Sequence, residues 1–234
     1  MSRILYFLVR LFRGASLILK SQIYKQRVTK MEDLTEAHFS YWSSLTHPNY
    51  QSFSDTVKLL DKKPAIIIET GSSAWGTDST RLWDSYVSRY GGSLVTIDVS
   101  SAASKRLKWQ LGRRSELIVS DSVTYLRNYS GPEIDFAYLD SWDVDPNNPV
   151  PSAQHGLKEF EALYPHLKHG GLVLVDDTPR RVSDEDYSRY PNLRKFKETY
   201  SVTPGKGAFI LANLHKFSGI EVVSQDYSLL LRYA

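Results

Sequence analysis

The sequence contains no cysteine among its 234 residues. Disulfide bonds, thiolate metal sites and cysteine nucleophiles are therefore excluded. No Gly-x-Gly-x-x-Gly stretch follows a predicted strand, which argues against a nicotinamide-dependent oxidoreductase. Gly205-Lys206-Gly207 is a candidate for holding an anion, but it lacks the Gly-x4-Gly-Lys-Ser/Thr spacing of a P-loop. Nucleotide hydrolysis is thus not supported.

The overall charge is only weakly basic, and the excess lies at one end of the chain. The formal net charge is +3, and hydrophobic residues make up 41% of a chain whose length suits one folded domain. Without the first 30 residues, 22 basic and 26 acidic side chains remain. The first 30 residues hold seven basic side chains and no acid: Arg3, Arg10, Arg13, Lys20, Lys25, Arg27 and Lys30. A slightly acidic body predicts no nucleic-acid partner, since such proteins carry a basic stripe on the domain itself.

Residues 1–30 form a predicted basic amphipathic helix ahead of a domain at 31–234. Its apolar residues recur at helical spacing: Ile4, Leu5, Leu8, Leu11, Phe12, Ala15, Ile18 and Leu19. Arg10 and Arg13 interrupt that run, which excludes a transmembrane helix and a secretory signal. Two interpretations stay open. The helix packs on the domain or on a second subunit of a homo-oligomer, or it lies on an anionic membrane. We therefore expect a cytoplasmic protein, with peripheral contact at the inner membrane face under the second interpretation.

From Pro64 onward, short apolar runs alternate with amphipathic stretches, which indicates repeated βα units and an α/β fold. The predicted strands are Ala65–Ile68, Ser93–Ile97, Glu116–Val119, Ile134–Leu139, Leu172–Val175, Ile220–Gln225 and Ser228–Tyr233. The last two form a predicted closing hairpin. The predicted helices are a stretch ending near Arg89, Ala102–Leu111, Ser122–Asn128, Ser152–Tyr164 and Phe209–Phe217. The polar segment 178–204 interrupts this alternation, and residues 180–187 within it are either a lid over the acceptor or a solvated linker.

Polar residues follow each of the first five predicted strands. They are Glu69-Thr70-Gly71-Ser72 with Gly76, then Asp98, then Ser120-Asp121, then Asp140 to Asp145, and finally Asp176-Asp177. In a parallel sheet, ligands bind at the carboxyl ends of the strands. Any one of these residues suits a helix cap or a turn. Five such groups at one edge favour a binding site, in which the glycines let the backbone approach a ligand closely.

These groups resemble the motifs of class I S-adenosylmethionine-dependent methyltransferases. Glu69-Thr70-Gly71 followed by Gly76 is similar to their cofactor-binding turn. Asp98 is similar to their ribose-binding acid, and Ser120-Asp121 to their adenine-contacting position. The resemblance implies a Rossmann-like, doubly wound, mostly parallel seven-stranded sheet with a C-terminal antiparallel hairpin. It also places Ser72, Asp140 and Trp142 against the cofactor.

A finer resemblance concerns the acids after the fourth and fifth strands. Leu139-Asp140-Ser141-Trp142 and Val175-Asp176-Asp177 look like the catechol and macrocin O-methyltransferase groups of metal-dependent enzymes. That likeness implies that Asp140, Asp176 and Asp177 hold Mg²⁺, a hard cation suited to oxygen ligands. The metal would orient the acceptor hydroxyl and lower its pKa. The alternative is that Asp177 caps the next segment and Asp140 tunes cofactor binding.

The general base departs from the catechol pattern. The lysine expected directly after Trp142 is Asp143 here. Asp143 is one candidate for the proton acceptor, or for a further ligand of the metal. The other is His155, because a histidine pKa near neutrality suits base catalysis; the alternative for His155 is ordinary packing on its helix.

Together these features predict an S-adenosylmethionine-dependent O-methyltransferase, assisted by Mg²⁺, that methylates a hydroxyl of a small molecule or saccharide. The membrane interpretation of residues 1–30 extends this to an acceptor such as a lipid-linked saccharide. Two alternatives stay open. One is an NAD(P)-dependent oxidoreductase on a Rossmann sheet, and the other is a non-catalytic scaffold that binds S-adenosylmethionine, since a fold does not secure an activity.

Overall fold

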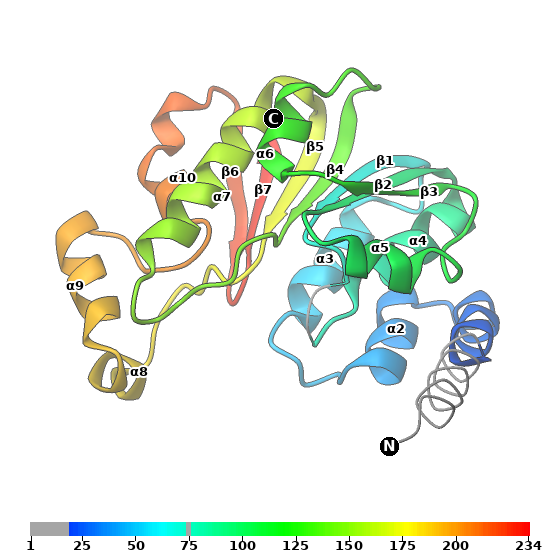
Figure 1. Cartoon of the computed structure of the whole chain (residues 1–234), viewed down its shortest axis with the longest axis horizontal. Coiled ribbons are helices and arrows are strands. Elements are labelled where there is room, and N and C mark those ends of the chain that lie inside the picture. Colours follow the sequence, from blue (N-terminus) through cyan, green and yellow to red (C-terminus); the bar gives the residue numbers. More distant parts are fainter. Residues whose placement is uncertain (1–18, 74–75) are drawn as a thin grey trace, which may run out of the picture.

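A mixed seven-stranded sheet organises the chain in the computed structural model, which describes residues 19–73 and 76–234 (Figure 1). Its strand order is β3-β2-β1-β4-β5-β7-β6. The strands are β1 Ala65–Thr70, β2 Gly92–Asp98, β3 Ser115–Val119, β4 Ile134–Leu139, β5 Leu167–Val175, β6 Ile220–Gln225 and β7 Leu229–Tyr233. The first five strands are parallel, and β7 is antiparallel to both β5 and β6. The predicted fold class is confirmed.

The register of the sheet brings the carboxyl ends of its central strands together. Thr70 at the end of β1 pairs with Ile97 on β2 and with Leu139 on β4. Leu139 in turn pairs with Val175, the last residue of β5. Chain order reverses between β1 and β4, and such a switch point is where ligands bind in open α/β sheets.

Two apolar layers sandwich the sheet, because successive side chains of a strand face opposite sides. The helices are α2 Leu34–Trp42, α3 Tyr50–Leu59, α4 Ser79–Tyr90, α5 Ser101–Leu107, α6 Ser122–Arg127, α7 Val150–Leu163, α8 Asp184–Arg189, α9 Pro191–Tyr200 and α10 Ala208–Ala212. Ile67 and Tyr138 pack with residues of α2, α3 and α4. Ile68 and Leu139, their neighbours in sequence, pack with residues of α6, α7 and α10. Figure 1 shows these helix groups on opposite sides of the sheet.

The sequence did not predict helices α2 and α3, because polar side chains fill much of their buried faces. Thr35 and His38 are buried in α2, and α3 buries Ser52, Ser54 and Thr56. Apolar periodicity, the main signal for a helix, is weak in such segments. The predicted helix 209–217 is split into α10 and a 3-10 turn, Leu214–Lys216.

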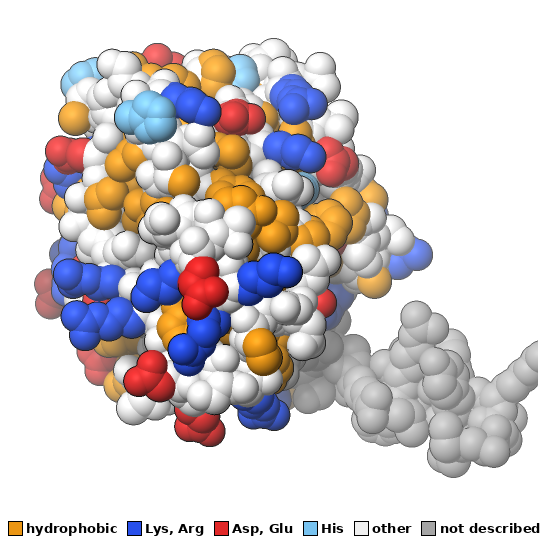
Figure 2. All heavy atoms as spheres, turned by 90° about the vertical axis from the view of Figure 1, so that its left-hand side faces the viewer, with side chains coloured by type: hydrophobic (Ala, Val, Ile, Leu, Met, Phe, Trp, Pro, Cys, Tyr) orange, Lys and Arg blue, Asp and Glu red, His pale blue; other side chains and the backbone are white. Residues whose placement is uncertain are grey.

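Segment 178–204 contains the two helices α8 and α9, and α8 begins within residues 180–187, the predicted lid or linker. Ser183 caps α8 by accepting a hydrogen bond from the amide of Asp186, and Pro191 begins α9. Both helices lie to one side of the sheet, away from β1 to β3 (Figure 1). Figure 2, which faces that side, shows Lys and Arg side chains gathered on it. The exposed basic residues of the two helices are Arg189, Arg194, Lys195 and Lys197.

Residues 19–30 are helical and pack against the domain, while residues 1–18 of the predicted N-terminal helix lie outside the described residues. The Tyr24 side chain is 1% exposed, and its hydroxyl lies 2.8 Å from Nδ1 of His38. Nη1 of Arg89 donates to the carbonyl oxygens of Val28 and Met31. Residues 19–30 are therefore part of the fold. None of the helices within residues 19–73 and 76–234 is long and apolar enough to span a membrane.

Tyr24 should anchor this helix to the domain. We expect Tyr24→Ala to lower the free energy of unfolding by about 3 kcal/mol, because it opens a cavity in a packed core. Ile23→Ala is the matched control, since Ile23 neighbours Tyr24 but is 48% exposed. Denaturant unfolding of the full chain measures both. Equal losses for the two variants would show that the helix is not docked through Tyr24.

Candidate active site

The turn after β1 is built for close contact with neighbouring backbone. Gly71 has φ +82°, and a Cβ at this position would lie 2.2 Å from the carbonyl oxygen of Asp140. The backbone amide of Ser72 donates to Oδ2 of Asp98 at 3.1 Å. Gly76, with φ +85°, lies beside His47. The glycine at position 71 therefore lets the end of β1 meet the segment that follows β4.

Glu69 is an internal support of this turn. It lies within β1, is fully buried, and accepts hydrogen bonds from the hydroxyls of Ser79, Thr80 and Thr96. Burial raises the pKa of Glu69 to about 7, although the three hydroxyl donors lower it. In this structure Glu69 joins β1, β2 and the start of α4.

Five predicted cofactor residues line one pocket at the ends of β1 to β4: Gly71, Asp98, Ser120, Asp121 and Trp142. Asp98 is half-buried, and its other carboxylate oxygen accepts from the amide of Ser100 at 2.7 Å. Asp121 is exposed and caps α6, where bonds from the Thr124 side chain and amide lower its pKa. Trp142 is 51% exposed at the pocket. Residues that are far apart in sequence thus share one cavity.

His155, a predicted base, lines this same pocket. Its Nε2 lies 2.9 Å from Oγ of Ser141 and 3.2 Å from Oγ of Ser122. Its ring lies against Trp142, with centroids 5.2 Å apart. Asp143, the other predicted base, is exposed. The contacts of His155 therefore place it on the cofactor side of the predicted site.

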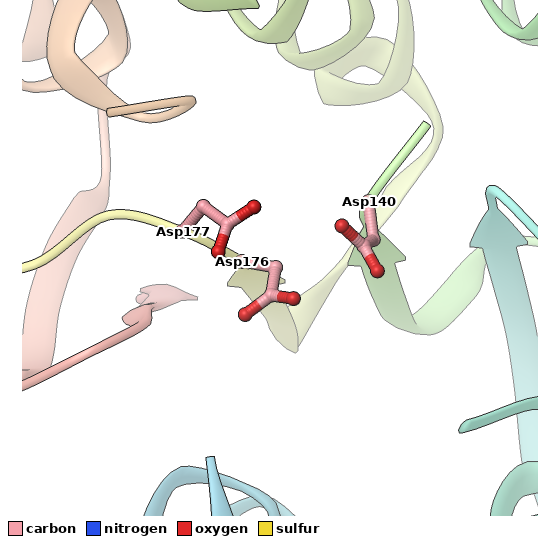
Figure 3. Close-up of side chains that lie close together, drawn as sticks. All are labelled: Asp140, Asp176 and Asp177. Atoms are coloured by element: carbon pink, nitrogen blue, oxygen red, sulfur yellow. The ribbon is translucent and has the colours of Figure 1, made fainter. Parts of the chain in front are cut away.

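The three predicted metal ligands converge at the ends of β4 and β5. Figure 3 shows the carboxylates of Asp140, Asp176 and Asp177 turned toward a common space. Each offers an oxygen within 4.8 Å of the others. Asp177 has φ +41°, a strained backbone conformation for a residue with a side chain. Burial, followed by the charge of Asp176, raises the pKa of Asp140 well above its usual range.

Asp176 is the most enclosed of these acids, at 6% exposed. Its Oδ1 accepts from Nδ2 of Asn49 at 2.8 Å and from the hydroxyl of Ser228 at 3.0 Å. Its Oδ2 accepts from the hydroxyl of Tyr138 at 2.9 Å. The side chain is therefore fixed by residues from three distant segments.

A lysine completes the cluster. Nζ of Lys206 is paired with Asp140, and it lies 3.0 Å from Oδ2 of Asp177. The lysine side chain is only 4% exposed. Burial alone would lower the pKa of Lys206, but the carboxylates of Asp140, Asp177 and Asp176 outweigh it and raise the pKa. Lys206 is therefore a charged ammonium at neutral pH.

The three carboxylates of Asp140, Asp176 and Asp177 fit a divalent cation, provided that the Lys206 ammonium moves away. Three carboxylates from two strand ends are the hard oxygen ligands that Mg²⁺ prefers. However, two of them already pair with the Lys206 ammonium. A metal held by Asp140 and Asp177 would therefore require that ammonium to move.

Sequence reasoning missed the hydrogen-bond partners of the cluster: Asn49, Tyr138, Lys206, Tyr227 and Ser228. The sequence did contain a signal for Lys206, because this lysine stands between two glycines directly before a predicted helix. That signal suggested an anion as its partner, and the structure supplies the protein's own carboxylates instead. The other four residues had no local signal.

The fold of the chain is similar to that of solved methyltransferase structures. No protein-family model matches the sequence, and no curated protein matches it. Among solved structures, the MycE methyltransferase of the mycinamycin biosynthetic pathway, in complex with Mg and SAH, aligns over 86% of this chain with a TM-score of 0.59 and 16% identity. This chain covers 55% of MycE, about half its length. The SAH-bound Podospora anserina methyltransferase PaMTH1 aligns over 91% of this chain and 94% of its own, with a TM-score of 0.53 and 16% identity.

A side chain at position 71 should destabilise the fold by more than the strain of the positive φ alone, because it would also clash with the backbone of Asp140. Gly71→Ala adds a clash with Asp140 to the strain of a positive φ, whereas Gly170 has φ +85° and nothing within 4 Å of an added Cβ. We expect Gly170→Ala to cost about 1–2 kcal/mol of unfolding free energy and Gly71→Ala clearly more. Denaturant unfolding compares them. Equal costs would contradict the packing of Gly71 on Asp140.

The raised pKa of Glu69 predicts a pH dependence of stability. The ordinary pKa is 4.5 and the folded value about 7, so the folded chain holds this proton more tightly than the unfolded chain. The contribution of Glu69 to the free energy of unfolding should therefore fall as the pH rises from about 4.5 to about 7. Urea unfolding of the wild type and Glu69→Gln across this range isolates the effect. A difference between the two chains that stays constant with pH would contradict it.

Proposed function

We propose that the chain is an S-adenosylmethionine-dependent O-methyltransferase acting on a hydroxyl of a small molecule. The observation that carries the proposal is one pocket at the switch point, lined by residues that follow β1, β2, β3 and β4. Asp140 connects this pocket to the acid–lysine cluster, because its backbone meets Gly71 while its side chain meets Lys206. A cofactor and a reacting hydroxyl can therefore be held side by side.

On the cofactor side, the carboxylate of Asp98 is held by the amides of Ser72 and Ser100. In this position it can accept hydrogen bonds from the two ribose hydroxyls. Asp121 and the neighbouring Ser122 would contact the adenine, with Trp142 and His155 forming an aromatic wall beside it.

On the acid side, an acceptor hydroxyl would lose its proton to a carboxylate as its oxygen attacks the methyl group, and the thioether leaves as S-adenosylhomocysteine. Without a metal, Asp140 is the proposed proton acceptor, because burial raises its pKa. Asp177, at 28% exposed, is the carboxylate of the cluster most open to an acceptor. A Mg²⁺ ion bound by Asp140, Asp176 and Asp177 would add Lewis-acid polarisation of the acceptor oxygen.

A cavity of about 490 Å³ next to the cluster is the proposed acceptor pocket. It is bounded by Asp177 and Tyr227 on one side and by Val182 and Leu193 of segment 178–204 on the other. Its volume falls in the usual range for small-molecule sites, roughly 300–1,000 Å³. Its other lining residues include Val144, Pro146, Pro179 and Pro204. Arg181, Ser183, Asp186 and Tyr190 add polar groups to this lining. The pocket therefore suits an acceptor that has both an apolar body and polar groups.

No specific feature of the described residues supports the two alternatives, an NAD(P)-dependent oxidoreductase and a non-catalytic scaffold. The turn after β1 lacks the glycine spacing of nicotinamide enzymes. Contact of residues 1–30 with a membrane, or with a second copy of the chain, stays a prediction. Truncation to test it should stop at residue 18, since Tyr24 belongs to the core.

Calorimetric titration with S-adenosylhomocysteine tests the cofactor assignment. We expect binding in the micromolar range for the wild type and about tenfold weaker binding for Asp98→Asn, which loses charge-assisted hydrogen bonds to the ribose. Glu221→Gln, on exposed β6, is the control and should bind like the wild type.

Absence of binding to the wild type would overturn the proposed function. Unchanged binding by Asp98→Asn would overturn only the ribose assignment. Once binding is established, hydroxylated acceptors with apolar bodies are screened beside free sugars for methyl transfer.

A further inference from the structure

The backbone around Lys206 is built to bring this side chain to the acids. Its amide donates to the carbonyl oxygen of Asp177 at 3.0 Å, and the amide of Gly207 donates to Oγ1 of Thr178 at 2.9 Å. A Cβ on Gly205 would lie 2.5 Å from the carbonyl oxygen of Asp177. On the opposite side, a Cβ on Gly156 of α7 would lie 2.3 Å from the carbonyl oxygen of Lys206. The glycines therefore allow the loop to fit between α7 and the segment after β5.

The ammonium of Lys206 lies where a shared cation of the cluster would lie. It pairs with Asp140, which follows β4, and with Asp177, which follows β5. These are two of the three residues whose oxygens converge closely enough to hold a metal ion. A buried ammonium is stable only with such partners, and buried carboxylates likewise need a cation or donors. Lys206 thus supplies within the chain a positive charge that a bound ion would otherwise provide.

We propose that Lys206 is the resident cation of this cluster, and that a divalent cation and its ammonium compete for Asp140 and Asp177. Two cations that share these carboxylates would repel each other at close range. The ion therefore binds only as the lysine withdraws. The inference concerns cation binding alone, and it does not rest on the proposed methyl transfer.

The place of Lys206 can be compared with the position after Trp142, where the catechol pattern has a lysine. Asp143 occupies that place in the sequence and is exposed. Lys206 brings an ammonium to the same edge of the sheet from the loop before α10. At this edge the buried ammonium therefore comes from Lys206.

Calorimetric titration with Mn²⁺, without cofactor, tests the competition. We expect Lys206→Met to bind Mn²⁺ at least about tenfold more tightly than the wild type, because the competing ammonium is gone. Lys168→Met is the matched control. Lys168 also pairs with an aspartate, Asp135 at 2.7 Å, but it lies at the start of β5 and is 52% exposed. Its removal should leave Mn²⁺ binding unchanged.

The site of the tighter binding is checked by adding Asp140→Asn to Lys206→Met, which should return the affinity to the wild-type level. Affinity that is no higher in Lys206→Met than in the wild type, including absence of binding in both, would overturn the proposal. Tight binding that survives Asp140→Asn would overturn it as well. If Lys206→Met fails to fold, Lys206→Gln is measured in its place, and the same outcomes decide.

Discussion

The buried contact between the Lys206 ammonium and the carboxylates of Asp140 and Asp177 is the interaction on which the rest of the site depends. Charges removed from water must have partners, so each of these side chains requires the others. Asp176 extends the network to Asn49 at the start of α3 and to Ser228 beside β7. Segments from the beginning, middle and end of the chain therefore meet at one edge of the sheet. In the proposed methyl transfer, this edge would supply a cofactor pocket, a proton acceptor and, from Lys206, a positive charge.

Asp140 connects the two halves of that edge. Its carbonyl oxygen lies so close to Gly71 that no side chain fits between them, while its carboxylate faces Lys206. One residue therefore contacts both the cofactor pocket and the acid–lysine cluster. His155 lies on the pocket side, against Trp142, and this favours a role beside the cofactor over the role of general base. The acids and Lys206 are then the groups proposed to face the acceptor.

The sheet could be predicted from the sequence because its strands are short apolar runs bounded by turns, a local signal. The groups that follow the strands could be predicted because parallel strands end at a common edge. Helices α2 and α3 could not, since buried polar side chains such as His38 and Ser52 hide their periodicity. The partners of Asp176 and Asp140 were also hidden. Asn49 is 127 residues from Asp176, and Lys206 is 66 residues from Asp140, so only the fold brings them together.

We propose that the pocket at the switch point holds the cofactor beside the acid–lysine cluster. A crystal structure with S-adenosylhomocysteine bound would decide this. We expect the ribose hydroxyls on Asp98, the adenine near Asp121 and Trp142, and the sulfur directed toward Asp140 and Lys206. A ligand bound elsewhere on the molecule, or one whose sulfur points away from the cluster, would show that the proposal is wrong.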